Sequence, residues 1–324
     1  MKIFICAGDL SGDQHSAALI SAIKQLRQDA FVFAVGGDKL KAVSDVFLDD
    51  IVNLNAFGFL PIKQIFALRK TFIKIKECFI KEKPDKIILT DYYGFNIKVA
   101  KLAKSLSIPV YYFISPQIWA SRKARIKILK KYIKKMLVIF PFEQKIYTDA
   151  GVDAYFIGNP LLDKVTQKEN FDLPACPVIG LFCGSRKDTI KRHLPVILKT
   201  VEIIKQNINA RFIMFSKDES IKDRLPSFIE FDAADDFNLR KIVNIAISPS
   251  GTVSLENALM AIPAAIMYKL SYINYFIIRS LIEVNYITIS NIIFDRPFYP
   301  EFIQYNAKPQ KIADYILWQL EPQN

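Results

Sequence analysis

The stretch "KIFICAGDLSGDQHSAALI" (residues 2–20) joins an apolar run to a turn of Gly, Ser and Asp, and then to a segment with helical spacing of its apolar residues. This succession is typical of a β-strand that leads into a helix of a parallel α/β sheet. Gly8 and Gly12 would let backbone amides approach a ligand at the start of the helix. The turn lacks the Lys of an ATP phosphate loop and does not match the dinucleotide fingerprint. It therefore predicts a sheet edge that presents small residues and carboxylates.

The same alternation of short apolar runs and helix-period segments continues along the chain, which indicates parallel βαβ units. In the first half we expect strands at residues 2–7, 31–35, 86–90, 110–114, 136–140 and 154–158. In the second half we expect strands at residues 177–183, 211–215, 228–231, 244–248 and 264–268. The predicted fold class is α/β, with two Rossmann-like, doubly wound domains that face a cleft.

A polar segment with three prolines, "GNPLLDKVTQKENFDLPACP" (158–177), separates the two sets of strands. Such a segment is typical of a domain boundary. We predict domains at residues 1–165 and 166–324. In doubly wound sheets ligands bind at the carboxyl ends of the strands, so a ligand is expected between the two domains.

Composition narrows the class of protein. The chain has 324 residues, of which 51% are hydrophobic and 23% charged, as in ordinary globular proteins. No apolar stretch is long enough to cross a bilayer or to serve as a signal-peptide core, so a cytoplasmic protein is expected. The four cysteines, at 6, 78, 176 and 183, have no C-x-x-C spacing. This argues against a zinc site and against a disulfide framework.

The net charge of +12 suits an anionic partner, such as nucleic acid, an anionic membrane surface or a phosphorylated substrate. The charge is concentrated in residues 62–76 and 121–135, and the second segment has eight basic residues and no acid. In 62–76 the apolar residues share one helical face and most of the lysines lie off it, a pattern that can rest on anionic lipid. The residues expected to contact the membrane are Ile62, Ile65, Phe66 and Lys70, with Ile73 and Phe79 on the same face. A solvated outer helix of a sheet domain is the alternative.

Polar residues follow several predicted strands of the first half. Asp91 directly follows "KIILT" and precedes Tyr92, Tyr93 and Gly94. A carboxylate at the end of a central strand is placed to take a proton from a bound hydroxyl group as a general base. The alternative is an N-cap for a helix that begins near Phe95. His15 and His193 are the only histidines, and neither is the preferred base.

Two turns of the second half predict a diphosphate site. The turn in "CGSRKDTIKRHLP" (183–195) holds Gly184, Ser185 and Arg186. The turn in "SPSGTVSLENAL" (248–259) holds Ser250, Gly251 and Thr252, with Glu256 one helical turn further along. Two helix N-termini with a guanidinium can stabilise a diphosphate, and a Glu on the adjoining helix can hold ribose hydroxyls. Ordinary N-caps at Ser185 and Ser250 are the alternative for each turn alone.

Read from end to end, the chain resembles the lipid-A-disaccharide synthase family, inverting glycosyltransferases of GT-B architecture. The stretches that carry the resemblance stand in the family's order: "AGDLSGDQHSAALI", "VGGDKL", "FGFLPIKQI", "PDKIILTDYYGFNIKVA", "YYFISPQIWASRKARIKILKK", "FPFEQKIY", "FIGNPLLD", "GSRKDTIKRHLP", "SPSGTVSLENAL" and "YITISNIIFDRPFYPEFIQ". Two residues depart from the family's pattern. Asp9 stands where a Glu is usual, and Gly94 stands where a second acid is usual.

The resemblance implies transfer of 2,3-diacylglucosamine from UDP-2,3-diacylglucosamine to the 6-hydroxyl of 2,3-diacylglucosamine 1-phosphate, which gives the β-1,6 lipid A disaccharide 1-phosphate and UDP. No cofactor and no metal are implied. Asp91 would be the catalytic base, together with Asp9. The implied substrate-binding residues are Ser11, Gly12, Ser115, Gln117, Gly184, Ser185, Arg186, Ser250, Gly251, Thr252, Glu256, Asn291, Glu301 and Gln304. For Asn291, Glu301 and Gln304, loop capping is the alternative. The family also implies a peripheral position on the anionic inner-membrane surface, and it is compatible with a homodimer.

Two other classes of protein stay open at this point. A basic α/β protein could bind nucleic acid, although the aromatic residues do not interleave with the basic runs and no nucleic-acid-binding signature is found. A catalytically degenerate scaffold that binds UDP without turnover is the second alternative.

Overall fold

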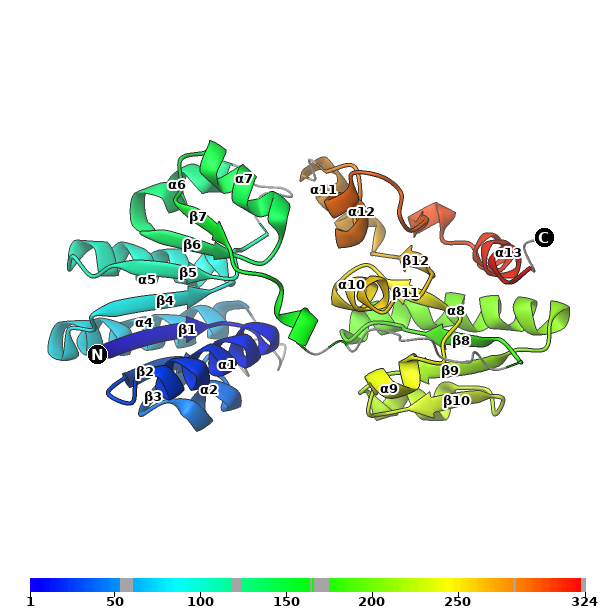
Figure 1. The fold of residues 1–324 in the computed structure, drawn as a ribbon, viewed down its shortest axis with the longest axis horizontal. Coiled ribbons are helices and arrows are strands. Elements are labelled where there is room, and N and C mark those ends of the chain that lie inside the picture. Colours follow the sequence, from blue (N-terminus) through cyan, green and yellow to red (C-terminus); the bar gives the residue numbers. More distant parts are fainter. Residues whose placement is uncertain (53–60, 118–123, 164, 166–174, 282–283, 322–324) are drawn as a thin grey trace. The chain divides into compact units, whose positions relative to one another are not determined.

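The computed structural model describes residues 1–52, 61–117, 124–163, 165, 175–281 and 284–321. The chain divides into two compact units, Met1–Pro160 and Leu161–Asn324, and the division falls inside the polar segment at 158–177. Each unit is a parallel sheet with helices packed against it (Figure 1). The predicted α/β fold class is therefore confirmed.

The first unit alternates strands and helices throughout the described residues. Its elements are β1 (Lys2–Ala7), α1 (Leu10–Leu26), β2 (Phe31–Gly36), α2 (Asp38–Val43), β3 (Val46–Asp50), α4 (Pro61–Glu82), β4 (Lys86–Thr90), α5 (Tyr93–Ser105), β5 (Val110–Phe113), α6 (Ala124–Tyr132), β6 (Lys135–Val138), α7 (Pro141–Asp149) and β7 (Ala154–Phe156).

The second unit has the same alternation, with several short helices in place of longer ones. Its elements are η2 (Pro160–Asp163), β8 (Val178–Leu181), α8 (Lys187–Asn207), β9 (Arg211–Phe215), η3 (Glu219–Arg224), β10 (Ile229–Asp232), α9 (Phe237–Arg240), β11 (Ile245–Pro249), α10 (Thr252–Leu259), β12 (Ala264–Tyr268), α11 (Tyr272–Leu281), α12 (Ile289–Phe294), β13 (Glu301–Ile303), η4 (Gln304–Asn306) and α13 (Pro309–Leu320).

Strand order gives each sheet one point where the direction of winding reverses. The first sheet has the order β3-β2-β1-β4-β5-β6-β7, and the second has the order β10-β9-β8-β11-β12-β13, with all pairs parallel. The reversal lies between β1 and β4 in the first sheet and between β8 and β11 in the second. Ligands of open α/β sheets bind at such switch points, outside the carboxyl ends of the strands. The residues that follow these four strands are therefore the first candidates for a site.

Burial explains why these segments become strands. The central strands are almost fully buried: Ile3, Phe4 and Ile5 of β1 are at most 1% exposed. Strands covered on both faces read as continuous apolar runs, the pattern that predicted them. Two edge strands were missed, β3 and β13, which are only half-buried along their length and therefore have no such run.

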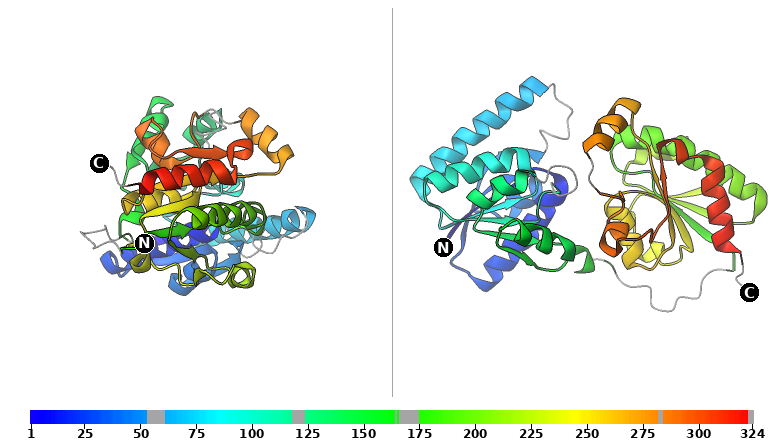
Figure 2. Two further views of the ribbon diagram at one scale, coloured as in Figure 1. Left: turned by 90° about the vertical axis from the view of Figure 1, so that its right-hand side faces the viewer. Right: turned by 90° about the horizontal axis from the view of Figure 1, so that it is seen from above.

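Helix α4 has two faces. Thr71, Ile75 and Phe79 are buried against the unit, whereas Ile65, Phe66, Ile73 and Ile80 are more than half exposed. Phe79 was predicted to share the exposed face, and that prediction is wrong because the buried row of the helix runs through Ile75 and Phe79. Figure 2 shows α4 beside α5, with which it packs. Across the described residues, every helix is too short or too polar to span a bilayer.

Candidate active site

Two carboxylates follow the switch-point strands of the first unit. Asp9 lies after β1 and Asp91 directly after β4, and β1 and β4 are hydrogen-bonded neighbours. Asp91 has a positive φ of 43°. Its carbonyl accepts hydrogen bonds from Asn96 Nδ2, at 3.0 Å, and from the Tyr112 hydroxyl, while its N–H donates to the carbonyl of Ile114. Residues other than glycine rarely adopt a positive φ. The three hydrogen bonds therefore stabilise Asp91 in a strained backbone conformation.

The Asp91 carboxyl has a pKa raised to about 6. Burial is the largest cause, followed by the negative charge of Asp9 and, more weakly, by that of Glu143; a hydrogen bond from the Tyr92 N–H lowers the pKa in part. Removal from water and like charges both disfavour the ionised form. A carboxyl group with this pKa can take up a proton near neutral pH, as a general base must.

The alternative role of Asp91 as a helix cap is wrong. Helix α5 begins at Tyr93, and its N-cap is Tyr92. Asp9, in contrast, is an N-cap: its Oδ1 accepts from the Gly12 N–H at 2.6 Å. Asp9 therefore orders the glycine turn and also adds negative charge beside Asp91.

The opening turn is packed against the residue that follows Asp91. A Cβ atom on Gly8 would lie 2.2 Å from ring carbons of Tyr92, so only glycine fits there. The neighbouring predicted residues differ in burial, since Ser11 is exposed and Gly12 is buried. The glycine turn thus brings the start of α1 close to the end of β4.

Two other polar residues of the first unit, Asp13 and Ser115, form buried hydrogen bonds. Asp13 is buried and accepts hydrogen bonds from the N–H groups of Gly37, Lys39 and Leu40, at the start of α2. Ser115 is also buried, and its hydroxyl donates to Glu143 Oε1 at 2.6 Å. Gln117 is exposed.

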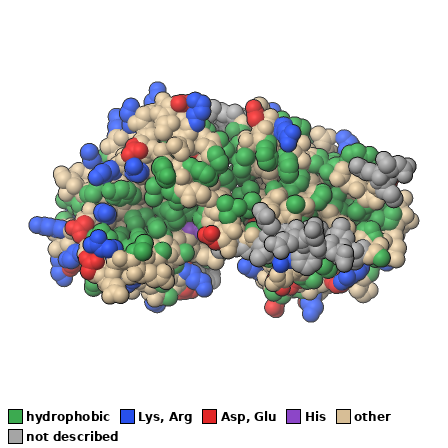
Figure 3. All heavy atoms as spheres, in the orientation of Figure 1, with side chains coloured by type: hydrophobic (Ala, Val, Ile, Leu, Met, Phe, Trp, Pro, Cys, Tyr) green, Lys and Arg blue, Asp and Glu red, His purple; other side chains and the backbone are tan. Residues whose placement is uncertain are grey.

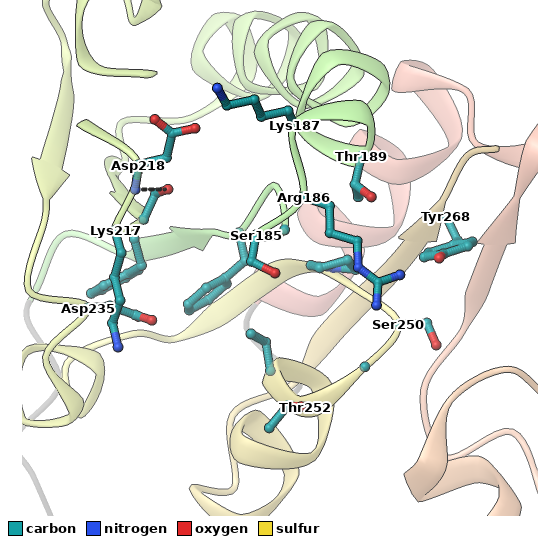
Figure 4. A pocket seen from close by; sticks show the side chains of 17 residues that line it. Ser185, Arg186, Lys187, Thr189, Lys217, Asp218, Asp235, Ser250, Thr252 and Tyr268 are labelled. Atoms are coloured by element: carbon teal, nitrogen blue, oxygen red, sulfur yellow. Dashed lines mark hydrogen bonds between the residues drawn. The ribbon is translucent and has the colours of Figure 1, made fainter. Parts of the chain in front are cut away.

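In the second unit, a pocket of about 790 Å³ opens at the switch point (Figure 4). It is lined by six of the predicted residues, Gly184, Ser185, Arg186, Ser250, Gly251 and Thr252. Arg186 and Thr252 flank the first turns of α8 and α10, so two helix N-termini are directed to one pocket. Backbone N–H groups and a guanidinium at one place form an anion site.

The N-cap alternatives for the two serines are wrong. The N-cap of α8 is Arg186 and that of α10 is Gly251, and neither helix has a capping bond from a preceding serine. Ser250 Oγ instead donates to the carbonyl of Ile287 at 2.6 Å, which ties the pocket to the chain before α12. Gly184 has a φ of +97°, a conformation that favours glycine and turns the chain toward α8.

Four of the implied substrate-binding residues do not line this pocket: Glu256, Asn291, Glu301 and Gln304. Glu256 is nearly buried and forms an ion pair with Arg240 Nη1 at 2.7 Å. The other three residues hold loops in place: Asn291 bonds to Tyr299 and Glu301, Glu301 accepts from the N–H groups of Ile287 and Thr288, and Gln304 bonds to both backbone groups of Leu270. These contacts match the loop-capping alternative.

Several residues around the two sites were not predicted. In the first unit the residue that was not predicted is Glu143, whose negative charge raises the pKa of Asp91. In the second unit they are Lys187, Lys217, Asp218, Asp235 and Tyr268, which line the pocket. His193 is buried, accepts from the Lys269 N–H and has a pKa lowered to about 4 by burial, so its ring is neutral. Glu143 is the third residue of α7, which begins at Pro141. Proline followed by an acidic residue is a signal for the start of a helix, and it does not indicate a neighbouring active site.

Solved structures show which fold the chain shares. The chain matches a putative UDP-N-acetylglucosamine 2-epimerase from Listeria monocytogenes with a TM-score of 0.66 and 11% identity, over 99% of this chain and 88% of that chain. It matches MurG of Acinetobacter baumannii with a TM-score of 0.59 and 14% identity, over 99% and 91%. It also matches a UDP-GlcNAc 2-epimerase from Methanocaldococcus jannaschii in complex with UDP-GlcNAc and UDP, with a TM-score of 0.62 and 13% identity, over 100% and 94%. The fold is that of the GT-B glycosyltransferases and epimerases.

Sequence relatives identify the family. The lipid-A-disaccharide synthetase family model matches residues 3–324. Lipid-A-disaccharide synthase 1 of Legionella pneumophila is 34% identical over 97% of this chain and 87% of that protein, and the synthase of Coxiella burnetii is 32% identical over 100% and 90%. The chain belongs to the lipid-A-disaccharide synthetase family. It is a glycosyltransferase of lipid A biosynthesis that uses a UDP-sugar donor and a lipid acceptor.

Proposed function

We propose that Asp91 is the general base of the transfer and that the pocket at the β8/β11 switch point takes the UDP group of UDP-2,3-diacylglucosamine. The 6-hydroxyl oxygen of 2,3-diacylglucosamine 1-phosphate bonds to the anomeric carbon as the bond from that carbon to the diphosphate breaks. The hydroxyl proton passes to Asp91, and attack opposite the leaving group inverts the anomeric centre. The products are the β-1,6 disaccharide phosphate and UDP.

The observation that supports Asp91 most directly is its pKa of about 6 at the end of β4. A base with this pKa is ionised at neutral pH yet still has useful affinity for a proton. Asp9 supports it in two ways, because its charge raises the pKa of Asp91 and its carboxylate orders the turn beside it.

The pocket is suited to stabilise the charge of the leaving group. Negative charge grows on the diphosphate as its bond to the sugar breaks, and groups that are already oriented stabilise that charge without reorganisation. Arg186, Lys187 and the first N–H groups of α8 and α10 provide this positive potential. In Figure 4 the guanidinium of Arg186 extends toward Ser250 and Tyr268 on one side of the pocket.

We further propose that the enzyme is cytoplasmic and binds the anionic inner membrane through the outer face of α4. Ile65 and Phe66 are 56% and 64% exposed, and Arg69 and Lys70 are exposed beside them. The side chain of Ile62 lies outside the described residues. The neighbouring helices α5 and α6 carry exposed lysines, among them Lys101, Lys127 and Lys131. Figure 3 shows further Lys and Arg side chains along the upper left margin of the first unit. Apolar side chains flanked by cations suit the interface of an anionic bilayer.

The experiment that tests the reaction uses the purified protein with UDP-2,3-diacylglucosamine and 2,3-diacylglucosamine 1-phosphate. We expect UDP and disaccharide phosphate in equal amounts. Binding of UDP without product would favour the degenerate scaffold and would contradict the proposal. The Asp91→Asn protein is the matched control, since it keeps the size of the side chain and removes the base.

A further inference from the structure

A buried arginine lies behind one wall of the pocket. Arg240, the last residue of α9, is 1% exposed. Its Nε donates to Asp235 Oδ1 at 2.9 Å, its Nη2 donates to the same oxygen, and its Nη1 donates to Glu256 Oε2 at 2.7 Å. Charged residues are seldom fully buried unless they are paired, and this guanidinium is paired with two carboxylates.

The same guanidinium also contacts aromatic rings. Its central carbon lies 4.8 Å from the ring centre of Phe182 and 4.7 Å from that of Phe237. Phe182 is stacked on Phe215 with ring centres 5.1 Å apart. A guanidinium over aromatic faces is an attractive contact that strengthens when water is excluded. Arg240 therefore holds two rings and two carboxylates in fixed positions.

Three of these residues line the pocket, namely Phe182, Phe215 and Asp235. Arg240 binds Asp235 through Oδ1 only, and Oδ2 has no hydrogen-bond donor among the described residues. The backbone of Asp235 has a positive φ of 54°. One carboxylate oxygen is thus anchored and the other is available to a ligand.

Asp235 lies at the end of the pocket opposite the residues that are proposed to bind the diphosphate. In Figure 4, Lys217 and Asp235 lie on one side, and Arg186, Ser250 and Tyr268 lie on the other. A carboxylate repels a diphosphate and accepts hydrogen bonds from neutral donors, and aromatic rings suit a flat base. The pocket therefore has an anion-binding end and a nucleoside end.

We infer that Asp235 accepts a hydrogen bond from an N–H or O–H donor of the nucleoside, and that Arg240 is the positioning residue that fixes Asp235 for this contact. The inference rests on the proposal that the pocket binds UDP. It assigns nucleoside recognition to the loop before α9. Glu256 is the second partner of Arg240 through Oε2, and the other carboxylate oxygen of Glu256, Oε1, has no partner among the described residues.

The test measures binding of UDP by calorimetry to the unmodified protein, to Asp235→Asn and to Asp236→Asn. Asp236 is the matched control, because it is the next residue, carries the same charge and caps α9 through the Asn238 N–H without lining the pocket. We expect Asp235→Asn to bind UDP about tenfold to a hundredfold more weakly, the usual effect of losing a hydrogen bond to a charged group. Asp236→Asn should bind UDP as the unmodified protein does.

Three UDP analogues identify the donor: 2′-deoxy-UDP, 3′-deoxy-UDP and N3-methyl-UDP. The analogue that lacks the donor should bind the unmodified protein weakly, and this discrimination should disappear in Asp235→Asn. If Asp235→Asn binds UDP normally, or discriminates all three analogues as the unmodified protein does, the inference is wrong. Loss of UDP binding in Arg186→Ala, together with normal binding in Asp235→Asn, would overturn only the nucleoside contact. Normal UDP binding in both variants would overturn the pocket as well.

The role of Arg240 is tested with Arg240→Lys, which keeps the charge but cannot hold both carboxylates with a planar fork. We expect the KM for the donor to rise while kcat stays near that of the unmodified enzyme, with thermal unfolding followed in parallel. A variant that folds and has an unchanged KM would refute the positioning role.

Discussion

The two units have the same architecture, but the residues at their switch points differ in charge. In the first unit, β1 and β4 are followed by Asp9 and Asp91. In the second unit, β8 and β11 are followed by turns whose charged residue is Arg186 and whose helix N-termini point into a pocket. The fold supplies the position and the loops supply the chemistry. One switch point is suited to accept a proton and the other to bind an anion.

This comparison is tested most strongly by Asp91→Ala. Loss of a general base costs ~10²–10⁴ in turnover, so kcat should fall by that factor. Binding of UDP should stay near normal, because the proposed nucleotide pocket is built from residues of the second unit. Single-turnover kinetics and calorimetry measure the two quantities separately, and parallel losses in both would contradict the division of labour.

Arg186→Ala tests the opposite site. A charge-assisted bond to the diphosphate exists before and during the reaction, so UDP affinity and turnover should both fall, by roughly tenfold to a hundredfold. Lys191→Ala is a control on the same helix, because Lys191 is exposed and does not line the pocket. Unchanged UDP affinity in Arg186→Ala would remove Arg186 from the diphosphate site.

The pH dependence of kcat/KM sharpens the account of the first unit. The pKa of Asp91 is raised to about 6, so its base form is lost as the pH falls through that value. At pH 5 the rate should be about tenfold below its value at neutral pH.

Asp9→Asn should move the acidic limb of that profile to lower pH, since the pKa of Asp91 falls when the neighbouring negative charge is removed. Asn is also a good N-cap, so α1 should remain intact. An acidic limb that stays in place would mean that another group limits the rate.

The smallest effect is expected on the outer face of α4. Each Lys near an anionic surface contributes ~1 kcal/mol, so Lys70→Gln should weaken binding to anionic vesicles about fivefold at low salt and less at high salt. Phe66→Ser should weaken binding at all salt concentrations, because burial of an apolar side chain is not screened. Sedimentation with vesicles measures both.

Leu26→Ser is the control for the membrane prediction, because Leu26 is 83% exposed and lies at the end of α1. If it lowers vesicle binding as much as Phe66→Ser does, the effect is not specific to α4. Since Phe66 is itself exposed, the substitution should not unfold the protein.

Most of the fold could be predicted from local pattern. Buried parallel strands must be apolar along their whole length, and the turns after them need glycine or small polar residues, so the central strands and the loops around Gly8, Gly184 and Gly251 are visible in the sequence. The two half-buried edge strands, β3 and β13, have no such pattern, and they were missed.

The sequence by itself determined the α/β class, the family, and the loops that are proposed to carry the chemistry, because each is written in short stretches of the chain. Only the tertiary structure decided which distant residues meet. It brought the charge of Asp9 to Asp91, joined Arg240 to Glu256, and turned Phe79 inward while leaving Phe66 exposed. These contacts arise from strand pairing and from packing between helices and sheets. A raised pKa or a buried ion pair depends on such neighbours, and the local sequence does not specify them.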